Sequence, residues 1–536
     1  MPPSKLVPCP PRQALLRLQR RLQRRLEQSV RDALGTQSAE LTSYEARYQR
    51  EFRNPRGLVS FDDLALRAAS ARVILCGDFH SFAQSQRTAL RLLRKLAAGP
   101  GKLVLAMEMV RRSDQRLLDR YLAGTLDERA FLRAIDYATT WGFDWHHYKP
   151  LLDFARTHGL AVQAVNGRDG LSLSERDDCV AETIATAARK LPHHRIYVMM
   201  GDLHLAAPHL PRRLRGLLGS QPMLTVFQNN ERLYWRLAGQ GLEHEAEVID
   251  LGRDRYCVMS GTPWVKVESY LSWLENGEAL SSRAVGEGLE EPVDVTDQLL
   301  ELAETVAGYL GLKGLDLDGF SAYTLDDLSF VAELRQRPAL KRLLPHLLQA
   351  EVFVLPELDL LYLGRLDVNH LAEAAAEFVH LKASATSLDT DLDGSGRFAA
   401  RVLRKALAYF GSKLVNPKRR GGLAAAPWPA LGAAAETRAL AARYARSVLA
   451  LLGAGELSRS QQRLLDAVSD DDLRLGLAIS TRAGRAVGED LFLAYVRGSM
   501  PLGEIRALYQ RHHDPRTAWQ TLAQVRATVG LVAAER

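Results

Sequence analysis

Short apolar runs alternate with longer amphipathic stretches between residues 70 and 260. The apolar runs span 73–76, 103–107, 161–165, 196–200, 223–227 and 248–251, and the helical stretches include 83–97, 112–123, 127–138, 147–157 and 172–190. Strands that alternate with helices indicate crossover connections and a mainly parallel sheet. We therefore predict an α/β domain with flanking helices, in which the stretch 112–157 forms a small helical lid.

The pattern changes near residue 285. Strand signals fade, and Leu- and Ala-rich helical periodicity continues to the C-terminus, interrupted by a loop with proline and glycine at 415–432. The predicted organisation is an N-terminal basic helix and linker (1–59), the α/β domain (60–284) and an all-α region of unknown role (285–536).

A basic amphipathic helix is expected at residues 12–34. Its leucines recur at helical spacing, and the rest of its surface carries Arg17, Arg20, Arg21, Arg24, Arg25 and Arg31. Such a helix suits a peripheral contact with a membrane surface or a protein partner, or it docks on the domain with its basic face in solvent. The docked helix is the favoured interpretation.

The composition narrows the class of protein. The chain has 536 residues, 47% of them hydrophobic and 25% charged, which is typical of a globular protein. A net charge of +7 over this length gives no argument for specific nucleic-acid binding. Four widely spaced cysteines, without a transmembrane stretch or an apolar leader, favour free thiols in a cytoplasmic protein.

The same short motif follows two of the predicted strands. Gly77-Asp78-Phe79-His80 comes directly after the first strand, and Gly201-Asp202-Leu203-His204 comes directly after the fourth. In parallel sheets, ligands bind beyond the carboxyl ends of the strands, where glycine lets the backbone approach closely. Because Glu108 follows the second strand and Asn166 the third, all these side chains are expected at one edge of the sheet.

Two imidazoles and a carboxylate form an open metal site. The predicted ligands of a divalent ion (Mn, Co, Zn or Fe) are His80, His204 and Glu108, and the edge of the site would consist of Gly77, Gly201 and Asn166. A metal-bound water becomes nucleophilic, and the candidate catalytic carboxylates are Asp78, Glu108 and Asp202. The alternative, in which each histidine only caps a helix, is less favoured because the motif occurs twice.

A second group of candidate residues lies in the predicted lid. Trp141 and the segment Asp144-Trp145-His146-His147-Tyr148 combine aromatic rings with histidines. Such residues stack on a flat ligand or bind haem iron, for which tyrosine and histidine are both known ligands. The alternative is a loop anchored by buried tryptophan rings, with His146 and His147 exposed.

Four segments in this order resemble the ChaN-like haem-binding uptake family of the Tiki/TraB/erythromycin-esterase-like superfamily. They are VILCGDFH, LVLAMEMV, DWHHYKPLLDFARTHGLAVQAVN and IYVMMGDLH, over roughly residues 70–230. The superfamily pattern of two G-x-x-H motifs with acidic residues matches residues 77–80, residues 201–204 and Glu108. Asp78 departs from the pattern, because relatives usually carry glutamate there.

The resemblance implies a haem- or iron-binding protein, or alternatively a metal-dependent hydrolase of peptide, ester or amide bonds that uses the same two histidines. In haem binders of this type a tyrosine ligates the iron. The resemblance therefore implies Tyr148, together with His147 and Trp145, as haem-binding residues, and Tyr137 and Tyr121 are further candidates for the ligand. The partner would then be haem or a small peptide or ester, and a homodimer is also considered. Members of this branch are largely exported, whereas this chain shows no export signal.

Two patterns in the helical half carry possible chemistry. His370, Glu373, Glu377 and His380 share one face of a predicted helix, which we interpret as an exposed polar face rather than as ligands of a metal in a helix bundle. Residues 389–394 match the opening of a calcium-binding loop, but Ala400 stands where a bidentate glutamate is needed. An acidic turn is the favoured interpretation.

Overall fold

The computed structural model divides the chain into two compact units. Unit 1 contains residues 22–290, and unit 2 contains residues 6–21 and 291–536. The structure describes residues 6, 9–285, 293–325, 327–336, 341, 344, 351–355, 358–386, 395–419, 473–514 and 517–533. The helix α1 (Pro10–Leu34) has residues in both units.

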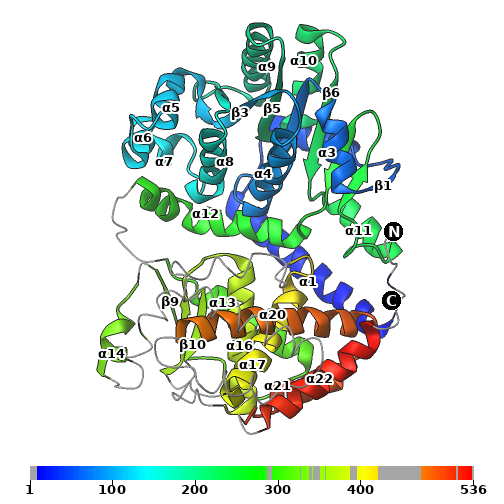
Figure 1. Ribbon diagram of the computed structural model, residues 1–536, viewed down its shortest axis with the longest axis vertical. Coiled ribbons are helices and arrows are strands. Elements are labelled where there is room, and N and C mark those ends of the chain that lie inside the picture. Colours follow the sequence, from blue (N-terminus) through cyan, green and yellow to red (C-terminus); the bar gives the residue numbers. More distant parts are fainter. Residues whose placement is uncertain are drawn as a thin grey trace. The chain divides into compact units, whose positions relative to one another are not determined.

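Unit 1 is built on an eight-stranded, mostly parallel sheet (Figure 1). Its strands, in chain order, are β1 (Gly57–Val59), β2 (Val73–Asp78), β3 (Lys102–Arg111), β4 (Ala161–Asn166), β5 (His194–Gly201), β6 (Met223–Gln228), β7 (Val248–Asp250) and β8 (Arg255–Val258). The strand order across the sheet is β1-β7-β8-β6-β2-β5-β3-β4. All six predicted apolar runs are strands, so the α/β prediction is confirmed.

Helices cover both faces of this sheet. The main core lies between one face and the helices α3 (Phe61–Ala69), α4 (Ala83–Ala97) and α8 (Trp145–Thr157). The helices α9 (Leu173–Lys190) and α10 (Leu210–Leu218) pack on the other face, followed in the chain by α11 (Glu231–Gln240) (Figure 1). Burial on both faces explains why the strands read as continuous apolar runs.

Helical segments from before, within and after the sheet border the edge where the motifs lie. The insertion predicted as a lid contains η1 (Arg112–Asp114), α5 (Gln115–Leu122), α6 (Glu128–Ala134), α7 (Tyr137–Thr140) and α8. Before the sheet comes α2 (Ala39–Arg50), between β5 and β6 comes η2 (Asp202–Leu205) in the second motif, and after the sheet comes α12 (Pro263–Val285). Neither α2 nor α12 was assigned to the site from the sequence.

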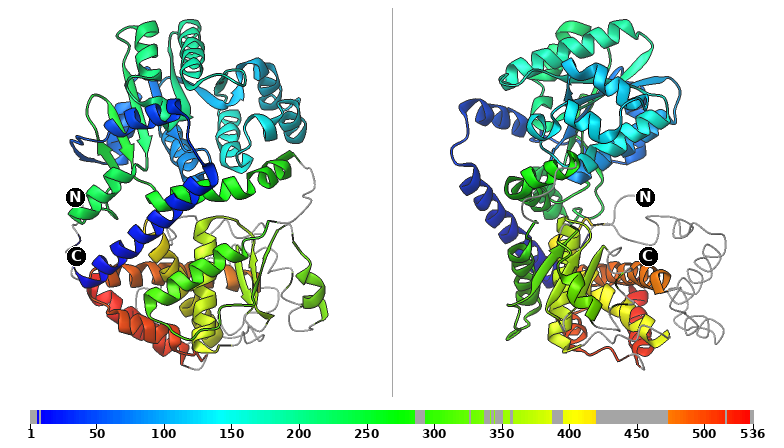
Figure 2. Two further views of the ribbon diagram at one scale, coloured as in Figure 1. Left: turned by 180° about the vertical axis from the view of Figure 1, so that it is seen from behind. Right: turned by 90° about the vertical axis from the view of Figure 1, so that its left-hand side faces the viewer.

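Unit 2 is mainly helical, with three short strands that the sequence pattern did not predict. Its helices are α13 (Thr296–Leu310), α14 (Phe330–Gln336), α16 (Val368–Ser384), α17 (Ser395–Val415), α20 (Leu473–Val496), α21 (Leu502–Gln510) and α22 (Ala518–Ala533). The strands β9 (Ser321–Thr324), β10 (Val352–Leu355) and β11 (Leu360–Leu363) pair in the order β10-β11-β9, to one side of the long helices (Figure 2). Most of the predicted loop 415–432 and all of the calcium-like segment 389–394 lie outside the described residues.

The four cysteines are free thiols, as predicted. Within the described ranges, no helix combines the length and the apolar character that crossing a membrane requires.

Candidate functional site

The two G-D-x-H motifs meet because their strands are neighbours. In the sheet, β5 lies between β2 and β3. His80 follows the end of β2, His204 lies in η2 directly after β5, and Glu108 lies inside β3, just after Met107, where the pairing with β4 becomes irregular. Parallel neighbours end at the same edge, so the three side chains come to one place.

Gly201 marks the point where these side chains converge. A Cβ atom added to it would lie 3.4 Å from Nε2 of His80, 3.5 Å from Oε2 of Glu108 and 3.5 Å from Cδ2 of His204. The amide N–H of Gly201 donates to Oε2 of Glu108 over 2.7 Å, and that oxygen lies 3.9 Å from Nε2 of His80. The backbone of Gly201 therefore lies where the three side chains come closest to one another.

An aspartate and a tyrosine hold His80. Nδ1 of His80 lies 2.8 Å from Oδ2 of Asp78, and the hydroxyl of Tyr148 donates to the same oxygen over 2.8 Å. Gln86 donates to the other oxygen of Asp78 over 2.6 Å. Burial lowers the pKa of His80, but the hydrogen bond and charge of Asp78 outweigh it, and the pKa is raised overall. Nδ1 is thus engaged, and Nε2 faces Glu108.

His204 is held by the same combination of residue types. Its Nδ1 lies 2.7 Å from Oδ1 of Asp177, and Tyr44 donates to Oδ2 of Asp177 over 3.0 Å. Arg213 also donates to Oδ2, over 3.3 Å. Two chains of tyrosine, aspartate and histidine therefore reach Gly201 from different elements, one through α8 and the other through α2 and α9.

Asp202 lies next to the first motif. Its Oδ2 accepts a hydrogen bond from Tyr48 over 3.0 Å and lies 3.8 Å from Nζ of Lys266. Its Oδ1 has no partner among the described residues and occupies the space beside Gly77, where an added Cβ would lie 1.6 Å away. Burial raises the pKa of Asp202 to about 6, although Lys266 and Tyr48 lower it. Asp202 therefore accepts a proton more readily than an exposed aspartate.

Half-buried aromatic rings lie beside His80. The His80 ring is 4.6 Å from that of Trp141 and 4.9 Å from that of Phe143, measured between centroids. Phe143 stacks on Trp273 at 4.5 Å, and Trp273 stacks on Tyr270 at 5.6 Å. The Phe79 ring lies 5.9 Å from that of Tyr270. We call these five rings the aromatic wall; its members are Phe79, Trp141, Phe143, Tyr270 and Trp273.

The structure places the residues assigned to haem mostly inside the core. Tyr148 and Trp145 are each 1% exposed, and Tyr137 and Tyr121 are also buried. The His147 side chain keeps 19% exposure. Tyr148 reaches the site only through its hydroxyl, which donates to Asp78.

The described residues contain no group of three or more His, Cys, Asp or Glu side chains that could hold a metal ion. His80, Glu108 and His204 do lie around one glycine, and each histidine binds an aspartate through Nδ1, which leaves Nε2 free of that contact. The predicted divalent-metal site therefore stays a prediction. Asn166 ends β4 at the border of the sheet, separated from β5 by β3.

Sequence reasoning missed several residues of the site, among them Tyr44, Tyr48, Asp177 and Lys266. Tyr44 and Tyr48 are separated by one helical turn of α2 and therefore share a face, which was the available signal. Asp177 lies in the second turn of α9; acidic residues are usually exposed, and yet it is fully buried. Lys266 looks like an ordinary surface lysine in the sequence.

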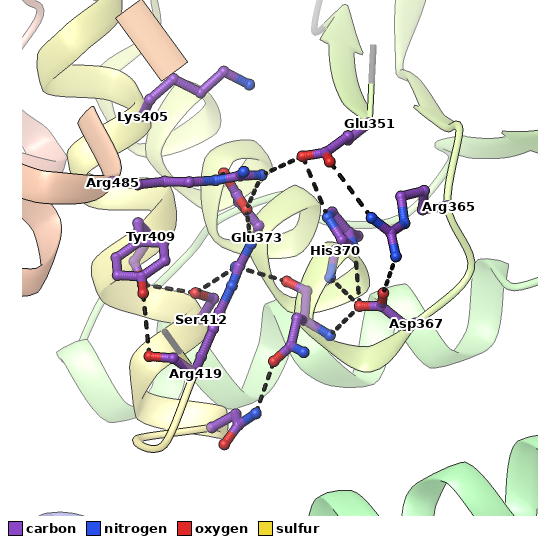
Figure 3. Close-up of polar contacts among 12 residues, drawn as sticks. Glu351, Arg365, Asp367, His370, Glu373, Lys405, Tyr409, Ser412, Arg419 and Arg485 are labelled. Carbon is purple, nitrogen blue, oxygen red and sulfur yellow. Dashed lines mark hydrogen bonds and ion pairs between the residues drawn. The ribbon is translucent and has the colours of Figure 1, made fainter. Parts of the chain in front are cut away.

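The polar face of α16 in unit 2 is buried, so the predicted exposed face is wrong. Glu373 is 1% exposed and Glu377 2% exposed. Arg419 and Arg485 bind Glu373, while Glu351 and Asp367 flank His370 (Figure 3). Glu377 binds Arg404 and Lys405. The cations come mainly from α17 and α20, whose packing against α16 a single-helix pattern does not reveal.

Comparison with known proteins supports the resemblance over part of unit 1. Residues 64–171 match the family described as haem-binding uptake, Tiki superfamily, ChaN. This confirms the expected resemblance for that segment, which contains Asp78, His80, Glu108 and Tyr148. No curated protein matches the chain.

Three solved structures are similar to the chain at low identity. The structure titled "Cofacial heme binding to ChaN of Campylobacter jejuni" has 15% identity and a TM-score of 0.26, and the match covers 32% of this chain and 87% of that chain. The type III effector HopBA1 has 14% identity and a TM-score of 0.28, and the match covers 38% of this chain and 96% of that chain. RRSP, a MARTX toxin effector domain from Vibrio vulnificus CMCP6, has 18% identity and a TM-score of 0.22, and the match covers 39% of this chain and 45% of that chain. At these TM-scores the likenesses carry no argument about function.

Proposed function

We propose that unit 1 binds an iron porphyrin, with His80 as the ligand of the iron. The placing of His80 carries the proposal: Asp78 occupies Nδ1, Nε2 lies 3.9 Å from the nearest oxygen of Glu108, and the side chain is 25% exposed. The family that matches residues 64–171 is described as haem-binding, which supports the same ligand class. Bound haem would supply an iron centre that accepts an imidazole nitrogen.

The surroundings of His80 suit this role. An aspartate on Nδ1 fixes the tautomer of a ligating histidine and makes the other nitrogen a stronger donor. Tyr148 orients that aspartate through its hydrogen bond. Trp141 and Phe143 offer aromatic surface next to His80, and aromatic rings pack favourably on a flat conjugated ligand. In this proposal Tyr148 supports the ligand through Asp78 and does not itself reach the iron.

A haemin titration of the full chain tests the proposal. The wild-type protein should give a saturable Soret shift, and His80→Ala should weaken binding by at least about tenfold. His146→Ala is the matched control, because the His146 side chain is 70% exposed and bonds to Asp144. Identical titrations for the wild type and His80→Ala would remove His80 as the ligand.

A hydrolase is the second candidate function, and the convergence on Gly201 favours it. His80 and His204 each have an aspartate on Nδ1, and both approach Gly201, as Glu108 does. A histidine held in this way takes a proton from water through Nε2 as the water oxygen attacks an acyl carbon. A nearby carboxylic acid or imidazolium then returns a proton to the leaving group.

Esterase assays on the same preparation separate the two candidates. Hydrolysis of a p-nitrophenyl ester should be lost in His204→Gln and in Glu108→Gln, whereas His146→Ala should retain it. Haemin binding should survive His204→Gln if His80 alone ligates the iron. Metal analysis of the wild type and His80→Ala then shows whether a divalent ion accompanies the activity; no hydrolysis of peptide, ester or amide probes would eliminate the second candidate.

A further inference from the structure

One side of α12 carries a row of site residues. Lys266, Tyr270 and Trp273 are spaced so that they share a face of the helix. Ser269 lies beside this row, and its hydroxyl is 3.3 Å from that of Ser81, the residue after His80. This face of α12 therefore borders the first motif, although α12 lies outside the segment that matches the family.

Lys266 places a positive charge between the two motifs. Its Nζ lies 4.5 Å from the centre of the Phe79 ring and 3.8 Å from Oδ2 of Asp202. The side chain is only 15% exposed. Asp202 is an imperfect partner, because the same oxygen accepts a hydrogen bond from Tyr48 and the distance to Lys266 is at the outer limit of an ion pair. Lys266 thus retains donors for an anionic group.

Trp273 is held rigidly in the aromatic wall next to this charge. Its ring stacks between Phe143 at 4.5 Å and Tyr270 at 5.6 Å, and its indole N–H donates to the carbonyl of Gly142 over 2.9 Å. Gly277 makes room for the ring, because a Cβ at that position would lie 2.7 Å from the indole. The aromatic wall and Lys266 therefore form one continuous border of the site.

We propose that this face of α12 selects the ligand: the aromatic wall receives a flat conjugated ring system, and Lys266 binds a carboxylate at the edge of that ring system. The inference rests on the proposed function for the class of ligand, and it adds that the ligand must be acidic. The attraction between an ammonium group and a carboxylate is stronger when the ammonium group is partly buried than when it is fully exposed, because water then screens the two charges less. The aromatic rings supply contact area for any flat ligand, and the ammonium group favours ligands that carry a carboxylate over ligands that do not.

Metal-free protoporphyrin IX and its dimethyl ester test this proposal on the full chain. The ester keeps the flat ring but lacks negative charge, and the absence of iron removes any contribution from ligation by His80. Wild-type protein should bind the acid at least about tenfold more tightly than the ester. Lys266→Met should abolish most of this preference, and Lys266→Arg should restore much of it. Lys149→Met, which removes a lysine paired with Glu128 on α6, should retain the full preference.

Each result decides one of the two proposals. Equal binding of acid and ester by the wild type, or an unchanged preference in Lys266→Met, would overturn the role of Lys266. Trp273→Leu should weaken both porphyrins together, and unchanged binding would overturn the role of the aromatic wall. If the wild type prefers the acid over the ester but haemin gives no Soret shift that depends on His80, the proposed role of α12 is supported and ligation of the iron by His80 is eliminated. If neither porphyrin nor haemin binds, both proposals fall.

Discussion

The hydroxyl of Tyr44 donates a hydrogen bond to Oδ2 of Asp177 over 3.0 Å, while the other oxygen of Asp177 lies 2.7 Å from Nδ1 of His204. A residue of α2, which precedes the segment matched to the family, therefore fixes the carboxylate that orients the second motif. The first motif has the equivalent contact from Tyr148. The site thus depends on helices on both sides of the matched segment.

Tyr44→Phe should destabilise unit 1 without altering its packing. Loss of a hydrogen bond to a buried carboxylate lowers the free energy of unfolding by about 1–2 kcal/mol. Urea-induced unfolding followed by circular dichroism measures this change. Tyr121→Phe is the matched control, because the Tyr121 hydroxyl is buried without a partner among the described residues. Equal effects of the two substitutions would show that the contact with Asp177 contributes nothing.

Gly77→Ala should displace Asp202. The added Cβ would lie 1.6 Å from Oδ1 of Asp202 and 3.2 Å from the carbonyl oxygen of Val226, so the carboxylate must move away. Overpacking of this kind costs about 1–3 kcal/mol. Gly216→Ala, in a helical position with open space around it, should instead stabilise the protein by up to about 1 kcal/mol. Thermal unfolding of the two variants gives the comparison, and a neutral Gly77→Ala would contradict the close approach.

Tyr148→Phe distinguishes the two assignments of the haem ligand. If His80 binds the iron, haemin should still bind, with a small Soret shift because Asp78 loses a donor and bonds more strongly to His80. If Tyr148 binds the iron, the substitution removes the ligand and the spectrum changes in form. An absorbance spectrum at saturating haemin decides between them.

Two histidines on α16 should respond to pH in opposite ways. Burial lowers the pKa of His370, but its hydrogen bonds with Asp367 and Glu351 outweigh it, and the pKa is raised overall. A raised folded-state pKa means that the stabilisation is present below the unfolded pKa and is lost as the pH rises through the folded value. The difference in thermal midpoint between wild type and His370→Gln should therefore shrink as the pH rises from about 6 to about 9.

His380 provides the comparison within the same helix. Burial lowers the pKa of His380 to about 4, and its Nδ1 lies 2.9 Å from the carbonyl oxygen of Tyr509. His380 is therefore neutral in the folded state throughout this interval, but the unfolded chain still protonates it below a pKa of about 6.5. The destabilisation caused by His380→Gln should accordingly grow as the pH rises from about 6 and level off above about 8. An effect of His380→Gln that shrinks with rising pH, or an effect of His370→Gln that grows, would contradict these protonation states.

The sheet was predictable because its buried strands are apolar on both faces. Each of the runs in β2 to β7 stands out from the amphipathic helices around it. The strands β1 and β8 were missed because each is short and begins with a residue that is not apolar in side chain, Gly57 and Arg255, so neither stands out as an apolar run. In unit 2, the strands β9 to β11 are equally short and lie among helices, so the periodicity does not separate them from their surroundings.

The candidate site was predictable only where its residues end a strand. His80, His204 and Glu108 are marked by their position after apolar runs, and the strand order brings them together. Asp177 and Lys266 carry no such mark, because their roles depend on how α9 and α12 pack on the sheet. The spacing of Tyr44 and Tyr48 indicated a shared face but not the carboxylates that this face meets.

The buried face of α16 also constrains how unit 2 evolves. Glu373 lies between the guanidinium groups of Arg419 and Arg485, and loss of the carboxylate alone would remove the ion-pair partner of Arg419 and one of the two partners of Arg485, at a cost of about 3–5 kcal/mol. A tolerated replacement at position 373 must therefore arise together with changes at 419 or 485. Across related sequences these three positions should therefore vary as a correlated set, which couples the evolution of α16, α20 and the segment after α17.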